Sequence, residues 1–262
     1  MLRLGALVAA AALLLSACKP GAVRVDFRPR SGSTYTYAID VKAATTTAIE
    51  GRAPTVSSND EHLEARHVVQ AIDGGGVIVD IKVTGSNGPE RTFEVTLDRA
   101  ASLVEVQRVE DIPASVLGDL GLSEVFPAAA GAPPDRRLRP GTNWTIDEPV
   151  TLPGTRAVRL TGSGRLVQLG VVDGRQVATI KSSYRLPVHQ TSQGGDGIVT
   201  LDGEQSTHTT ATHALHDGAV ESVQAHTTGR FAMTLSPPPG QAGPQLKGHL
   251  DVDVESTTRR RG

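Results

Sequence analysis

Four of the eight histidines, His208, His213, His216 and His226, stand close together in the sequence, and imidazole is a common metal ligand. If Asp217-Gly218 forms a two-residue hairpin turn, His213 and His226 share one face of the hairpin, about 13 Å apart at the rise of a strand. His208 and His216 then lie on the other face. Because no three of them come within the ~2 Å reach of one zinc ion, we predict solvated or edge-strand histidines, no metal site and no cofactor.

Other residue types that support catalysis lack the required spacing. Gly162-Ser163-Gly164 is not the spacing of a nucleophile elbow, and the segment has the pattern of a strand. Gly74-Gly75-Gly76 is followed by neither the Lys-Ser/Thr pair nor the helix start of a phosphate loop. Asp251, Asp253 and Glu255 alternate along one face of a strand, as on a solvated sheet. We therefore predict no catalytic residues and no enzymatic activity, with a hydrolase as the least favoured alternative.

Cys18, the single cysteine, ends a segment built like a secretory signal. The segment has a basic start at Arg3 and an apolar run over residues 4–15, shorter than the ~20 apolar residues that cross a bilayer. An ordinary signal peptidase prefers a small residue three positions before the cut, where this chain has Leu15. We predict a signal peptide over residues 1–17 and no disulfide within the chain.

The residues Leu15-Ser16-Ala17-Cys18 resemble the lipobox of bacterial lipoproteins. The resemblance implies that the Cys18 thiol carries a diacylglyceryl group and begins the mature chain, with residues 18–22 as a short lipidated tether. Two or more acyl chains hold a protein stably on a membrane. Lys19 after the cysteine implies the outer membrane if the host has one, and otherwise the outer face of the cytoplasmic membrane.

Composition limits the partners of the mature chain. The net charge is −2, with both signs interspersed, which argues against the concentrated basic face that nucleic acid requires, so we predict no nucleic-acid partner. Aromatic residues make up only 3% of the chain, so the core must come mainly from Val, Leu, Ile and Ala. The one basic cluster, Arg259 to Arg261, is predicted to be a solvated tail over residues 259–262, with contact to anionic lipid headgroups as the alternative.

Alternation of apolar and polar residues predicts an all-β chain of curved, mainly antiparallel sheets. The pattern has a period of two in residues 35–42, 91–97 and 231–235. Asx-Gly pairs, the strongest short hairpin signal, separate such runs. They are Asp73-Gly74, Asn87-Gly88, Asp173-Gly174, Asp202-Gly203 and Asp217-Gly218.

One segment has helical spacing instead. Ile112, Val116 and Leu120 recur at intervals of four, with Pro113 near the start, which predicts a short helix near residues 113–121. A Pro-rich linker over 127–140 follows it. We therefore predict a first β half over residues 23–126 and a second β half over residues 141–258.

The two halves resemble each other in the order of their motifs. Phe27-Arg28-Pro29 precedes Tyr35 in the first half, and Leu138-Arg139-Pro140 precedes Trp144 in the second. Each half then continues to a strand and an Asp-Gly turn. Tyr35 and Trp144, at matching positions, are predicted to be core anchors.

Pro140-Gly141-Thr142-Asn143-Trp144, in a β-rich lipoprotein of this size, resembles a bacterial lipoprotein family of unknown function. The layout is also similar to envelope lipid carriers, whose curved sheet encloses acyl chains. These resemblances imply an extracytoplasmic, lipid-anchored binding protein of the cell envelope. The most specific version of this hypothesis is that the protein binds an apolar ligand. The alternative is a structural or accessory envelope protein that acts through protein partners.

Overall fold

The computed structural model describes residues 21–73, 76–85, 90–98, 103–110, 133–150, 158–194, 197–238 and 240–261. Over these ranges the chain forms strands and no helix, so the prediction of an all-β protein is confirmed. The helix predicted near residues 113–121 lies outside the described residues. The strands are β1 (Thr34–Ile49), β2 (Thr55–Asp73), β3 (Gly76–Gly85), β4 (Arg91–Leu97), β5 (Leu103–Glu110), β6 (Asn143–Val150), β7 (Val158–Val172), β8 (Arg175–Gly194), β9 (Gly197–Ala214), β10 (Val220–Ser236) and β11 (Leu246–Arg261).

All these strands belong to one antiparallel sheet with the order β5-β4-β3-β2-β1-β11-β10-β9-β8-β7-β6. The first strand pairs with the last, β11, over fourteen residue pairs. The two predicted halves therefore share one sheet. Its end strands β5 and β6 approach each other, but no pairing joins them in the described part of the chain.

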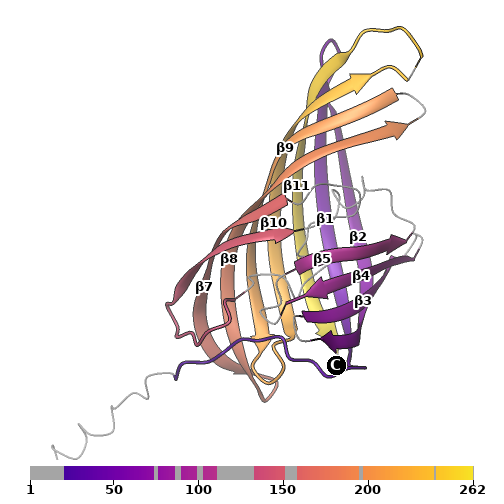
Figure 1. Cartoon of the computed structure of the whole chain (residues 1–262). Helices are drawn as coiled ribbons and strands as arrows, with labels where there is room; N and C mark the ends of the chain where they lie inside the picture. The colour runs from indigo at the N-terminus through magenta and orange to yellow at the C-terminus, as the bar shows by residue number, and fades with distance from the viewer. Residues whose placement is uncertain are drawn as a thin grey trace, which may run out of the picture.

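The sheet coils around itself, as Figure 1 shows. Strands β9, β10, β11, β1 and β2 are long and extend past the short strands β3, β4 and β5, which cross the front of the view. We call the end where the long strands project the flared end, and the opposite end, where the chain terminates, the closed end. The right-handed twist of each strand, accumulated over eleven strands, produces this coiling.

Strand β1 illustrates how the sequence selects the inner face. Tyr35, Tyr37, Ile39 and Val41 are each 5% exposed or less and point inward. The polar residues between them, such as Asp40, point outward. The predicted strands at residues 35–42, 91–97 and 231–235 are confirmed within β1, β4 and β10.

Two apolar clusters fill the inside of the coiled sheet. The larger one joins the inner faces of β1 to β4 with those of β9 to β11. The smaller one contains Trp144, Ile146, Leu166 and Ile180. Tyr35 and Trp144 are both buried, which confirms their predicted role as core anchors.

The described N-terminal segment runs across the closed end, as Figure 1 shows in indigo. Val25 and Phe27 are buried there, and the Arg28 amide donates a 2.7 Å hydrogen bond to the Asp217 carbonyl. Val23 forms an isolated bridge with Leu138, which is fully buried. Part of the predicted linker over residues 127–140 is therefore core structure.

The predicted similarity of the halves appears in their first hairpins. The Gly32 amide donates to the Val69 carbonyl at 2.8 Å, and the Gly141 amide donates to the Leu166 carbonyl at 2.7 Å. Both glycines have positive φ, 78° and 90°. A β-bulge follows Val69 in β2 and Leu166 in β7. The same local geometry thus begins each half.

The prediction of a solvated basic tail over residues 259–262 is wrong for the residues described. Arg259 to Arg261 are the last residues of β11 and pair with residues 36–38 of β1. Their backbone groups complete the ladder in the middle of the sheet. The cluster is therefore part of the fold.

Asp202-Gly203 is not a turn, contrary to the prediction, and lies inside β9. A Cβ at position 203 would collide with the Arg230 carbonyl and come within 3.0 Å of Phe231, so the glycine permits close approach of β10. Asp173-Gly174 is a two-residue turn with positive φ at both residues, as predicted.

Candidate functional site

The predicted lipid-attachment residue, Cys18, lies outside the described residues. Within the part of the chain that the structure describes, no helix is long and apolar enough to span a membrane.

The predicted hairpin register around the histidines is wrong. Asp217-Gly218 belongs to a five-residue loop over residues 215–219, and a bulge follows Val220. His213 therefore opposes Val220 and is buried, while His226 opposes His208 on the exposed outer face. The two histidines that were expected to share a face lie on opposite faces.

Several exposed histidines lie beside aspartates. His226 Nε2 lies 3.1 Å from Asp253, and His62 Nδ1 lies 2.7 Å from Asp40. Among the described residues, no group of three or more His, Cys, Asp or Glu side chains has the geometry to hold a metal ion. Asp251, Asp253 and Glu255 lie on the outer face of β11, as the sequence predicts for a solvated sheet.

Titratable groups are buried near the closed end. Burial lowers the pKa of His67 to about 3, and its ring meets Tyr37 edge-on with centroids 4.9 Å apart. Burial, with Asp217 nearby, raises the pKa of Tyr35 to about 12. His67 and both tyrosines are therefore neutral at pH 7. All three side chains are buried at the apolar core, so we assign these groups to packing.

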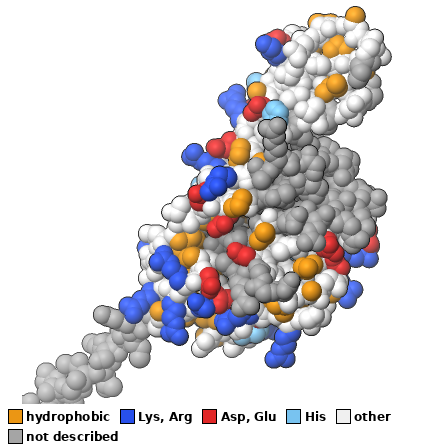
Figure 2. Space-filling view, viewed as in Figure 1, with side chains coloured by type: hydrophobic (Ala, Val, Ile, Leu, Met, Phe, Trp, Pro, Cys, Tyr) orange, Lys and Arg blue, Asp and Glu red, His pale blue; other side chains and the backbone are white. Residues whose placement is uncertain are grey.

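The inner face at the flared end carries a continuous apolar surface. It consists of residues paired across three neighbouring strands, and we call it the inner apolar surface: Val199, Leu201, Phe231, Met233, Leu235, Leu246, Leu250 and Val252. All of these except Phe231 are partly exposed. Figure 2 shows hydrophobic side chains on this part of the molecule, at the top of the view.

Glycines keep the inner apolar surface shallow. Gly203, Gly229 and Gly248 lie in register among its residues. The Phe231 ring lies over Gly229, where an added Cβ would be 2.6 Å from the ring. Phe231 consequently packs flat against the sheet and is only 6% exposed.

A band of small hydroxyl residues separates the inner apolar surface from the core. The Ser182 and Thr209 hydroxyls lie 2.6 Å apart, and those of Thr207 and Thr227 lie 2.9 Å apart. All four residues are buried. We call these four residues the hydroxyl belt. It satisfies its polar groups by cross-strand hydrogen bonds, as buried polar groups must.

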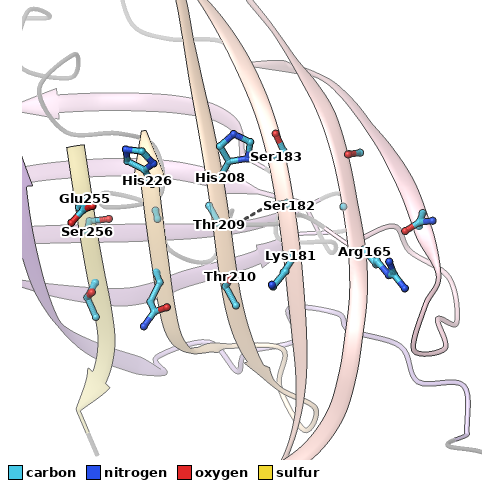
Figure 3. A pocket seen from close by; sticks show the side chains of 16 residues that line it. Arg165, Lys181, Ser182, Ser183, His208, Thr209, Thr210, His226, Glu255 and Ser256 are labelled. Carbon is cyan, nitrogen blue, oxygen red and sulfur yellow. Dashed lines mark hydrogen bonds between the residues drawn. The ribbon is translucent and has the colours of Figure 1, made fainter. Parts of the chain in front are cut away.

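A groove of about 780 Å³ crosses the outer face from β6 to β11. Two in-register rows of polar side chains form its walls. One wall contains Asn143, Arg165, Lys181, Thr210, Gln224 and Thr257. The other contains Ser163, Ser183, His208, His226 and Glu255. Figure 3 shows the groove, with His208 and His226 side by side on neighbouring strands.

Arg165 and Lys181 concentrate positive charge at one end of this groove. They oppose each other across β7 and β8, and both are exposed. No salt bridge to either side chain occurs within the described part of the chain. Ser163, the rejected nucleophile, lies exposed in β7 on the opposite wall of the groove.

Sequence reasoning missed the Arg165–Lys181 pair because of a bulge. A regular hairpin from the Asp173-Gly174 turn would place Ser182 opposite Arg165. The bulge after Leu166 shifts the register by one residue and brings Lys181 into that position. The sequence contains a signal for the turn but none for the bulge.

No protein family and no curated protein matches the chain. Among solved structures, a mutant of a Rh. blastica porin is similar at 11% identity with a TM-score of 0.21. The similarity covers 87% of this chain and 99% of the porin. A TM-score this low carries no structural argument.

Proposed function

We propose that this protein binds an apolar ligand, such as a lipid acyl chain, on the inner apolar surface at the flared end. The single observation that supports the proposal is an apolar inner face that stays partly exposed. Val199, Leu201, Met233 and Leu250 are only partly buried, and across β9, β10 and β11 they pair with apolar residues or glycine on that face. The positions in register with them on β8 and β1, at the borders of this surface, are polar residues: Gln190, Ser192 and Thr47. Ligand sites are mostly apolar and concave, and the coiled sheet supplies the curvature.

The contrast between the two faces of the same strands supports this proposal. On the outer face, Arg230 lies 3.3 Å from Asp251, and His189 lies 3.3 Å from Asp202. The outer face of these strands therefore carries charged and polar side chains that water can solvate. Each CH₂ group of a chain transferred from water to the inner face contributes about 0.8 kcal/mol.

We further propose that the protein is held outside the cytoplasm by acyl chains on Cys18 and acts by binding, without catalysis. The resemblance of residues 15–18 to a lipobox supports the anchor. Cys18→Ser should release the protein from membranes into the soluble fraction. Continued sedimentation of this variant with membranes would contradict lipid anchoring as the sole attachment.

The experiment that tests ligand binding is native mass spectrometry with lipid extraction on the Cys18→Ser protein, exported by an ordinary signal peptide. We expect a bound mass that matches an extracted lipid. A clean apo mass would contradict the proposal and would favour the alternative of an envelope protein that acts through protein partners.

Adjacent residues of β10 provide matched variants. Met233 lies on the inner apolar surface, whereas its neighbour Ala232 is exposed on the outer face. We expect Met233→Gln to weaken lipid binding about tenfold, the effect of losing one to two kcal/mol of apolar contact. Ala232→Gln should leave binding unchanged. An equal loss of lipid affinity in both variants would mean that the ligand does not bind on the inner apolar surface.

A further inference from the structure

The outer groove has features that the proposed function does not use. It lies on the opposite face of the sheet from the smaller apolar cluster, and its floor is the backbone of residues whose side chains point inward. Ser182 and Thr209 are two of these floor residues. A ligand in the groove would therefore not contact the inner apolar surface, so the two surfaces can be tested separately.

The Arg165–Lys181 pair is electrostatically unfavourable in isolation. Like charges directly opposite each other in a sheet destabilise it, and neither side chain forms a salt bridge in the described part of the chain. By contrast, Arg185, two residues after Ser183 on the same face, lies 3.7 Å from Glu204. An anionic group between Arg165 and Lys181 would relieve the repulsion.

The rest of the groove supplies hydroxyl and amide groups, two imidazole rings and, at the opposite end on β11, the Glu255 carboxylate. Ser163, Ser183, Thr210 and Gln224 line it beside the two cations. The six strands from β6 to β11 span about 24 Å at the usual strand spacing. Such a long, open, polar surface matches a hydrated chain that carries many hydroxyl groups.

Other occupants fit the groove less well. Its strands from β7 to β11 are each paired on both sides, so a peptide cannot add to them as a strand. No Phe, Tyr or Trp is among its described lining residues, so nucleic acid bases would have only the imidazole rings of His208 and His226 on which to stack. An acyl chain would meet only polar walls.

We propose that the outer groove binds an anionic glycan, with a carboxylate or phosphate group held between Arg165 and Lys181. Figure 3 shows these two residues on the neighbouring strands β7 and β8, where their backbones are in register. The hydroxyl and amide groups of the walls would contact sugar hydroxyls on either side. Charge-assisted hydrogen bonds to Arg would be the strongest single contacts.

The test measures binding to the Cys18→Ser full chain by isothermal titration calorimetry. The probes are an oligogalacturonate for the carboxylate, a phosphorylated oligomannoside for the phosphate, and dextran as a neutral glycan. We expect binding of at least one anionic probe, weaker at higher salt, and none of dextran. The preferred anionic probe identifies the charged group. Dextran binding equal to the anionic probes, or no binding of any probe, would overturn the proposal.

Variants locate the bound anion. Arg165→Gln and Lys181→Gln should each weaken binding about tenfold, and the double variant more, as expected for charge-assisted contacts. Arg185→Gln is the matched control, because Arg185 lies on the same face outside the groove and is paired with Glu204. An equal loss in Arg185→Gln, or unchanged affinity in Arg165→Gln and Lys181→Gln, would overturn the proposal.

Discussion

Arg260 stacks on Tyr35, with its guanidinium carbon 4.8 Å from the centre of the ring. The same guanidinium donates a 3.0 Å hydrogen bond to Glu221, which also pairs with Arg175 at 3.3 Å. The Arg260 and Glu221 side chains are 17% and 16% exposed. The end of the last strand is thus fixed to the first strand by a cation–π contact and to β10 by a shielded ion pair.

Removing this contact should destabilise the fold. Arg260→Gln loses the stacking and leaves Glu221 with only Arg175 on this side, so we expect the free energy of unfolding to fall by about 1–3 kcal/mol. Deleting residues 259–262 should cost more, because the β11 ladder to β1 is shortened as well. Urea unfolding, followed by far-UV circular dichroism, measures both.

The control for the Arg260 variant is Arg259→Gln. Arg259 is exposed on the opposite face of β11, and surface charges contribute about 0–1 kcal/mol. If Arg260→Gln has the same free energy of unfolding as the wild type, the stacked Arg260–Tyr35 contact does not contribute to stability.

His67 should make stability depend on pH in the acid range. The folded protein holds His67 neutral, with its pKa lowered to about 3 by burial, whereas in the unfolded chain its pKa is near 6.5. The unfolded state therefore binds one more proton between these values. Stability is fully present above about pH 6.5 and is lost as the pH falls toward 3, by up to about 1.4 kcal/mol per pH unit.

His67→Leu tests this dependence. The variant keeps an apolar side chain against Tyr37 and removes the titrating ring, so the slope of unfolding free energy against pH should flatten between pH 6 and 4. The exposed His189 supplies the control, since His189→Leu should keep the wild-type slope. An unaltered slope in His67→Leu would show that other groups cause the acid sensitivity.

Alternation and turn chemistry predicted much of this fold from the sequence. The inward set of β1, with Tyr35 and Val41, follows from a period of two, and Asp173-Gly174 follows from the positive φ that its turn requires. The pairing of β1 with β11 could not be predicted from the sequence, because no local pattern specifies a contact between the two ends of the chain.

The candidate sites depended on register, which the sequence did not specify. Two net one-residue shifts decide which side chains meet: one comes from the bulge after Leu166, the other from the five-residue loop before Val220 together with the bulge that follows it. They place Lys181 opposite Arg165 and move His213 into the core. Because a shift of one residue transfers every side chain to the other face, small loop errors produce large errors in a site.

Gly164 should not tolerate a side chain. A Cβ at this position would collide with the Trp144 indole, which is 7% exposed in the smaller apolar cluster. Gly164→Ala should therefore lower the free energy of unfolding by about 1–3 kcal/mol, as overpacking does. It should also shift the emission of Trp144, the single tryptophan, because the ring must move.

Gly170→Ala, on the same strand, is the control for this variant. Gly170 is exposed, and a Cβ there meets only a Val177 methyl group at 4.0 Å. Alanine in the interior of a strand makes the folded state more stable than glycine does, by roughly 0.5–1 kcal/mol. The free energy of unfolding should therefore stay equal or rise. Equal destabilisation in both variants would contradict the packing argument.

The Ser182–Thr209 pair in the hydroxyl belt should show strong coupling. Their oxygens lie 2.6 Å apart in a buried position. Ser182→Ala leaves the Thr209 hydroxyl without this partner, and we expect a loss of about 1–3 kcal/mol in unfolding free energy. The double variant Ser182→Ala/Thr209→Val removes both polar groups and should recover most of that loss. A double-mutant cycle in urea gives the coupling energy directly.

Additive losses in Ser182→Ala and Thr209→Val would contradict this prediction. They would show that each hydroxyl is satisfied independently of the other, and that this hydrogen bond does not hold the hydroxyl belt together.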